Sequence, residues 1–146
     1  MTGSPYEQRN PYKGTPPRPW VRVRLLAPNG TSQELDMVAD TGSPMALVIG
    51  QAAMVTLNRK SAPQRISNFG PMVGGWLRVH MPEVGVDQDL LSYASDTIVT
   101  AVQGSHPNFE GLVGLPFLRL VEYGGDADWF WIRPATPTSP PPAVPP

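Results

Sequence analysis

Short runs in which apolar and polar residues alternate are the feature that most constrains the fold of this chain. Residues 20–25 alternate with period two, with valines and a leucine on one side and arginines on the other, which predicts a half-buried strand. The pair Asn29-Gly30 comes soon after, and both residues accept the positive φ angles of a tight turn. Because residues 33–39 alternate again, the sequence predicts an antiparallel hairpin.

Much of the remaining chain also consists of short apolar runs of strand length. The segment 51–57 fits either a helical turn or a continued strand, and the sequence leaves both open. Pro116 suits the first turn of a helix, so one short helix is expected near the C-terminal end. Further strands are expected at residues 45–49, 76–81, 96–102, 112–113, 120–123 and 129–132. The sequence therefore predicts an all-β domain with one short C-terminal helix.

Proline is concentrated at the two ends of the chain. Of 19 prolines, five fall in residues 1–19 and seven in residues 134–146. Such segments favour polyproline II conformation and lack the apolar residues that a packed core requires. We therefore expect Pro-rich flexible tails over 1–19 and 134–146, and one folded domain over 20–133.

Charge and cysteine content exclude several classes of function. The net charge is -1 at pH 7, so nothing favours binding to nucleic acid or to an anionic membrane. The absence of cysteine excludes disulfides, thiolate metal sites and a cysteine nucleophile. His80 and His106 have no further ligands at metal spacing, so no metal is expected. Because neither a signal peptide nor a membrane-spanning run is seen, we expect a soluble cytoplasmic protein.

The tetrapeptide Asp40-Thr41-Gly42-Ser43 lies between two apolar runs. A carboxylate placed where a strand breaks into a glycine-containing turn points out of the ladder, and backbone N–H groups can hold it. Such a position suits a catalytic acid. The same residues are also common in β-turns, so the tetrapeptide alone leaves both interpretations open.

A glycine-rich stretch lies within residues 64–81. The segment predicts a hairpin whose centre, residues 68–75, contains Gly70, Gly74 and Gly75. Glycines at a hairpin tip would make it mobile and would let its backbone approach a ligand. An ordinary surface hairpin explains the same pattern when the segment is considered by itself.

Three features, in this order, resemble the retropepsin-like, single-domain aspartic proteases: a strand leading into Asp-Thr-Gly-Ser, a glycine-tipped hairpin, and an apolar-apolar-glycine step before a short helix. The likeness covers most of 20–133. It implies that Asp40 is catalytic and that Thr41, Gly42 and Ser43 support it. By the same resemblance the flap over the substrate is formed by Phe69, Gly70, Pro71, Met72, Val73, Gly74 and Gly75, and the closing segment by Leu112, Val113 and Gly114.

The resemblance also implies a small closed acid-protease-type barrel with the half-pepsin architecture of an obligate homodimer. The chain holds one Asp-Thr-Gly, so two copies of Asp40 would meet across a two-fold axis and share a proton. Thr41 would bond across the dimer, and the Gly42 backbone would help to hold the carboxylates coplanar. The expected activity is that of an aspartic endopeptidase that cleaves extended peptides without a metal or cofactor.

Two positions depart from the pattern of many retroviral members. Pro44 and Leu115 stand where those proteases carry an acidic residue and an arginine, so this dimer is expected to close through apolar contacts. Pro44 also removes an N–H that could meet the substrate backbone. This keeps open an alternative function, a catalytically weak or inactive dimerisation or peptide-binding module. The Ser43 hydroxyl is expected to donate to the Asp40 carboxylate, which would lower its pKa and give an acidic pH optimum.

Overall fold

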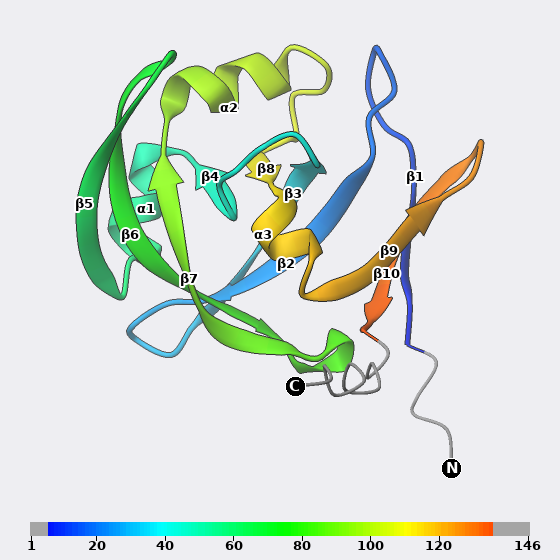
Figure 1. Ribbon diagram of the computed structural model, residues 1–146, viewed down its shortest axis with the longest axis horizontal. Coiled ribbons are helices and arrows are strands. Elements are labelled where there is room, and N and C mark those ends of the chain that lie inside the picture. Colours follow the sequence, from blue (N-terminus) through cyan, green and yellow to red (C-terminus); the bar gives the residue numbers. More distant parts are fainter. Residues whose placement is uncertain (1–5, 136–146) are drawn as a thin grey trace, which may run out of the picture.

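The structure is a computed structural model, and it describes residues 6–135 (Figure 1). Most of its regular elements are strands. In chain order these are β1 (Gln8–Pro11), β2 (Trp20–Leu26), β3 (Ser32–Ala39), β4 (Leu47–Ile49), β5 (Lys60–Ser67), β6 (Gly70–Met81), β7 (Val86–Ala94), β8 (Gly111–Val113), β9 (Val121–Gly125) and β10 (Trp129–Pro134). The helices are α1 (Gln51–Leu57), α2 (Asp96–Gln103) and α3 (Leu115–Leu118), and a 3-10 turn spans Pro82–Val84.

Six of the strands close into a barrel. Their order is β2-β3-β8-β4-β7-β6, and β6 returns to β2 through the pairs Leu25–Val79 and Leu26–Arg78. Strand β5 pairs with the part of β6 that precedes this contact. The prediction of a small, closed, all-β barrel is confirmed.

The core of the barrel follows the alternation seen in the sequence. Strand β2 buries Val21, Val23 and Leu25 completely, and β6 buries alternate residues from Leu77 to Met81. Removal of apolar side chains such as these from water is the dominant favourable contribution to the free energy of folding. The opposite faces carry the arginines and other polar residues, as the period-two pattern predicts.

The predicted hairpin of β2 and β3 is confirmed. Its turn is closed by a hydrogen bond from the Ala27 N–H to the Thr31 carbonyl oxygen at 2.8 Å. Gly30 has a φ of 88°, in the left-handed region that favours glycine. Strand β3 lies in the barrel wall between β2 and β8, and it ends immediately before Asp40.

Residues 6–135 contain three α-helices, whereas the sequence predicted a single one. The helix α1 resolves the ambiguity at residues 51–57, and α2 shows that the predicted strand over 96–102 was wrong. Ser95 caps α2, because its hydroxyl accepts a hydrogen bond from the Ile98 N–H at 3.2 Å. Ile98 and Val102, one helical turn apart, are both buried. The cap and this spacing outweigh the strand preference of β-branched residues.

The N-terminal segment belongs to a second sheet with the order β1-β10-β9, which lies to the right of the barrel in Figure 1. Strand β1 pairs antiparallel with β10 along its whole length. The Trp20 indole N–H donates to the Pro11 carbonyl oxygen at 2.7 Å and ties this segment to the barrel. The flexible tail predicted over 1–19 was therefore wrong for residues 8–11. Most of the tail predicted over 134–146 lies outside the described residues.

Candidate active site

Asp40 lies where β3 ends against β8. The two strands run parallel, and their last register pair is Ala39–Val113. Beyond it, the Asp40 N–H donates to the Val113 carbonyl oxygen at 2.9 Å, so the backbone of Asp40 is fixed by the barrel. The Asp40 side chain is nevertheless exposed, as the position of the strand end predicts.

The turn after Asp40 holds the carboxylate in place. The Gly42 N–H donates to Asp40 Oδ1 at 2.9 Å, and the Ser43 N–H donates to the Asp40 carbonyl oxygen at 3.1 Å. Thr41 and Gly42 are exposed beside it. A carboxylate that is oriented by its own loop and faces solvent is available to water, to a substrate or to a second molecule.

Ser43 has a different role from the one expected. Its side chain is buried, and its hydroxyl donates to the Met45 carbonyl oxygen at 3.3 Å while accepting from the Met45 N–H at 3.2 Å. The expected hydrogen bond to the Asp40 carboxylate is not formed, so that prediction was wrong. Ser43 instead closes the loop that follows Asp40, through its two hydrogen bonds with Met45.

The predicted closing segment packs directly against this loop. Leu112 and Val113 lie in β8, between β3 and β4, and both are buried. The Gly114 N–H donates to the Ala46 carbonyl oxygen at 2.9 Å. A Cβ atom on Gly114 would collide with the Met45 carbonyl oxygen, so the close approach of the two segments requires glycine. The loop and the closing segment therefore form one unit.

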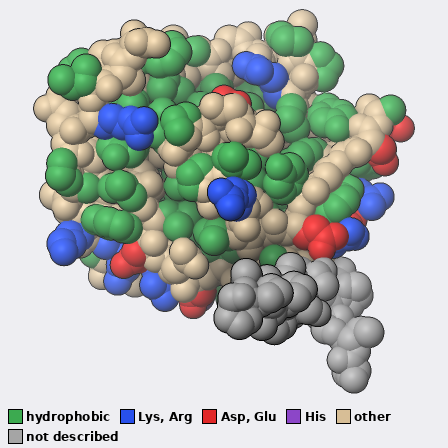
Figure 2. All heavy atoms as spheres, viewed as in Figure 1, with side chains coloured by type: hydrophobic (Ala, Val, Ile, Leu, Met, Phe, Trp, Pro, Cys, Tyr) green, Lys and Arg blue, Asp and Glu red, His purple; other side chains and the backbone are tan. Residues whose placement is uncertain are grey.

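The hairpin predicted as a flap is formed by β5 and β6. Its turn is tight, because the Ser67 hydroxyl accepts from the Phe69 N–H at 3.1 Å and donates to the Gly70 carbonyl oxygen at 3.0 Å. Gly70 has a φ of 92°, so it does lie at the tip. Phe69 is 58% exposed, and Figure 2 shows further hydrophobic side chains over the region of β5 and β6.

The other two glycines are not at the tip, and that part of the prediction was wrong. Gly74 and Gly75 lie inside β6, where they pair with both β5 and β7. A Cβ atom on Gly74 would lie 2.5 Å from the Pro63 carbonyl oxygen, and one on Gly75 would lie 2.7 Å from the sulfur of Met54. Here glycine permits close packing of β5 and α1 rather than mobility.

The remaining residues of the predicted flap divide between the tip and the barrel wall. Pro71 is exposed and pairs only with β5. Met72 is fully buried in a cluster that includes Ile98 of α2, whereas Val73 is 52% exposed. The freely projecting part of the hairpin is therefore shorter than the sequence suggested, since the register with β7 begins at Val73.

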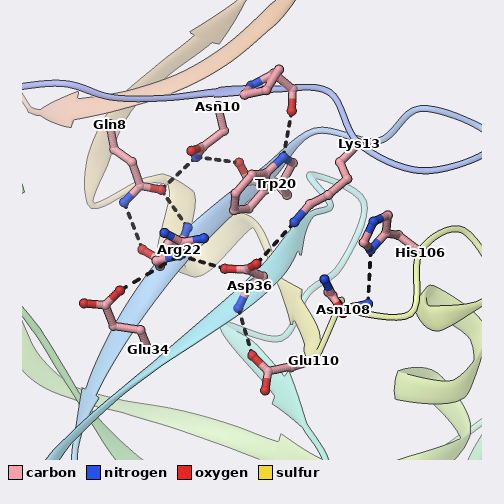
Figure 3. A network of polar contacts seen from close by, with 11 residues as sticks. Gln8, Asn10, Lys13, Trp20, Arg22, Glu34, Asp36, His106, Asn108 and Glu110 are labelled. Carbon is pink, nitrogen blue, oxygen red and sulfur yellow. Dashed lines mark hydrogen bonds and ion pairs between the residues drawn. The ribbon is translucent and has the colours of Figure 1, made fainter.

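A polar network that the sequence analysis missed joins the N-terminal segment to the barrel (Figure 3). The Asp36 carboxylate accepts hydrogen bonds from Arg22 at 2.9 Å and from Lys13 at 3.2 Å. The Asp36 backbone N–H donates to Glu110 Oε2 at 3.2 Å. The Lys13 ammonium also lies 3.9 Å from the centroid of the Trp20 ring, close enough for a cation–π contact.

The network has a structural role and is not a reactive site. Burial acts to raise the pKa of Asp36, but hydrogen bonds from Arg22 and Lys13 outweigh it, so the pKa lies below its ordinary value. A carboxylate engaged by two cations is not available to a substrate. Arg22 and Asp36 are register partners in the predicted hairpin, and their opposite charges were the signal that could have revealed the pair.

The histidines take part in local contacts. His80 Nδ1 lies 3.1 Å from an Asp87 carboxylate oxygen, and this hydrogen bond, with the charge of Arg78, lowers the pKa of Asp87. His106 accepts a hydrogen bond from the Asn108 N–H at 3.1 Å. Within residues 6–135 no three His, Cys, Asp or Glu side chains converge as a metal site would require. In the same range no helix combines the length and the apolar character needed to cross a membrane.

Of the predicted site residues, the structure brings together the Asp40 loop and the segment that ends at Gly114, and it holds the carboxylate open to solvent. Comparison with protein-family models, with curated proteins and with solved structures found no match for this chain. The chemistry of the candidate site must therefore be inferred from its residues and their geometry.

Proposed function

We propose that this chain is one half of a homodimeric aspartic endopeptidase of the retropepsin-like type. The observation that carries the proposal is the Asp40 carboxylate, which is exposed at the end of a barrel strand and is held by the Gly42 N–H. A catalytic acid needs this combination of a fixed orientation and access to substrate.

In this proposal the second carboxylate comes from another copy of the chain. Asp96, the other aspartate that precedes a threonine, is occupied at the start of α2, where it accepts a hydrogen bond from the Gln51 N–H at 2.9 Å. Asp36 is held by two cations. A symmetric dimer would place two Asp40 side chains together, and so supply the pair.

Two adjacent carboxylates explain the chemistry without a covalent intermediate. Because both cannot ionise easily at close range, they share one proton. The ionised Asp40 would take a proton from a water molecule, whose oxygen attacks the peptide carbonyl carbon. The protonated Asp40 of the second copy would donate its proton to the carbonyl oxygen, which gives a tetrahedral intermediate with two hydroxyl groups. The first Asp40 would then pass the proton taken from water to the amide nitrogen, while the Asp40 of the second copy takes a proton back from one hydroxyl, so that the C–N bond breaks and the amine leaves.

The β5–β6 hairpin supports an extended peptide as the substrate. Ile66 is 83% exposed, and Phe69 and Val73 are also largely exposed along the same hairpin. Exposed apolar side chains beside strand backbone suit a peptide that binds as an added strand and has apolar residues of its own.

Substitution of Asp40 tests the mechanism. Asp40→Asn should abolish cleavage of a peptide library at about pH 4 to 7 while the dimer persists in analytical ultracentrifugation, because the amide cannot act as a base. Asp89→Asn, at an exposed carboxylate on β7, is the matched control and should leave cleavage unchanged. A statine-type inhibitor should block the native protein. Cleavage that survives Asp40→Ala would refute the mechanism.

A peptide-binding module without turnover is the second candidate. Pro44 favours it, because this exposed residue directly after the Asp40 loop offers no N–H to a substrate backbone. Mass spectrometry of the same peptide library separates the two functions. Peptides that are retained by the native protein but remain uncut would indicate the module.

A further inference from the structure

A pocket of about 260 Å³ lies beside the loop that carries Asp40. Its lining includes Pro44 and Met45, Arg65 of β5, and Leu91 and Tyr93 of β7. Since a water molecule occupies about 30 Å³ of liquid, the pocket is large enough for one amino-acid side chain.

The pocket is continuous with the candidate active site along the chain. Pro44 directly follows Ser43, and Pro116, which also lines the pocket, lies just beyond Gly114. The same two segments are joined by the hydrogen bond from the Leu115 N–H to the Ser43 carbonyl oxygen at 3.0 Å. An extended peptide bound at Asp40 could therefore reach this pocket with a neighbouring side chain.

Arg65 is the charged residue of an otherwise largely apolar lining. Its guanidinium carbon lies 5.8 Å from the centroid of the Tyr93 ring, so the ring helps to orient the cation. No ion pair within residues 6–135 joins Arg65 to a carboxylate, in contrast to Arg24 with Glu83 and Arg78 with Asp87. Arg65 is exposed, so within this part of the chain its charge is open to solvent and accessible to a ligand.

We infer that this pocket receives an acidic side chain of the peptide substrate, glutamate or aspartate, and that Arg65 determines this specificity. The guanidinium can donate two parallel hydrogen bonds to a carboxylate. The apolar wall of Pro44, Met45 and Leu91 would pack against the methylene groups that carry the carboxylate. This inference depends on the proposed function, because it names the substrate class of the same site.

The test uses the Asp40→Asn protein as a trap that binds peptides without cutting them. The protein is incubated with a mixed peptide library, and the retained peptides are sequenced by mass spectrometry. We expect glutamate and aspartate to be enriched about tenfold over glutamine and asparagine at one position of the retained peptides. This is the change in affinity expected when a neutral amide replaces the carboxylate in a charge-assisted hydrogen bond. Adding Arg65→Gln to the trap should remove the enrichment, and adding Arg65→Glu should reverse it in favour of lysine and arginine.

Lys60→Gln is the matched control, since Lys60 is an exposed cation on the same strand and does not line the pocket. It should leave the enrichment unchanged. Equal retention of acidic and amide residues, retention of no peptide, or an enrichment that persists in Arg65→Gln would overturn the inference. Cleavage by the native protein is scored separately. Cleavage without an acidic preference rejects the role of Arg65 alone, whereas absence of cleavage with selective retention rejects the endopeptidase and keeps the pocket.

Discussion

Replacing Gly114 by alanine should destabilise the protein through a collision rather than through backbone strain. The φ of Gly114 is −103°, which alanine adopts freely. The added Cβ atom would collide with the Met45 carbonyl oxygen and would lie 2.7 Å from the Ser43 carbonyl oxygen. The Asp40 loop and the closing segment would have to move apart to restore ordinary contacts.

The separation breaks two hydrogen bonds that hold the candidate site together. These run from the Gly114 N–H to Ala46 at 2.9 Å and from the Leu115 N–H to Ser43 at 3.0 Å. Each contributes about 1 kcal/mol, and overpacking adds at least about 1 kcal/mol. We therefore expect Gly114→Ala to lower the free energy of unfolding by about 3 kcal/mol, with a fall of about 10 °C in Tm.

Urea denaturation followed by far-UV circular dichroism measures the change. Gly50→Ala is the control, because Gly50 has a φ of −71° and its added Cβ atom would make an ordinary contact with Asp96 Oδ1 at 3.4 Å. That variant should stay within about 1 kcal/mol of the native protein. If Gly114→Ala were as stable as Gly50→Ala, the close packing of the loop against the closing segment would be refuted.

Three other perturbations test the barrel wall, a helix cap and the polar network. Met72→Ala should lower the free energy of unfolding by about 3 kcal/mol because its side chain is fully buried, whereas Val73→Ala should change it by less than about 0.5 kcal/mol in the same urea assay. Ser95→Ala should cost about 1 kcal/mol and speed amide hydrogen exchange at Ile98. Because the pKa of Asp36 is lowered in the folded state, its contribution to the free energy of unfolding is complete above about pH 4 and is lost as the pH falls through the folded-state pKa. The free energy of unfolding of Asp36→Asn, measured by urea denaturation at several pH values, should therefore fall less on acidification than that of the native protein.

The sequence predicted the fold correctly where the local signals for secondary structure agreed with one another. Alternation placed β2 and β3, and Asn29-Gly30 placed their turn. For α2 two local signals disagreed, since β-branched residues favour a strand while the Ser95 cap favours a helix, and burial of one helical face decided the outcome. Strand β1 could not be found in this way, because its partner β10 lies at the far end of the described chain.

For the candidate site, the position of Asp40 was predictable because a strand end and a glycine turn are local features. The partner of Ser43 was not, because the hydroxyl bonds to the backbone of Met45, two residues further along the loop, and this choice depends on how the loop folds. The role of each glycine in the β5–β6 hairpin could not be predicted from the sequence either. Gly70 is used for its positive φ, whereas Gly74 is used for close contact, and only the neighbours in space distinguish the two.

The pairing of β1 with β10 also determines how the protein would respond to force. Gln8, at the start of β1, lies opposite Ile132, near the end of β10, so the first residue of β1 and the last residues of β10 lie at the same end of the sheet. Tension between residues 6 and 135 would open these hydrogen bonds one after another, as in a zipper, instead of loading them together in shear. In an optical trap, this small sheet should peel away at low force while the barrel that carries Asp40 stays closed.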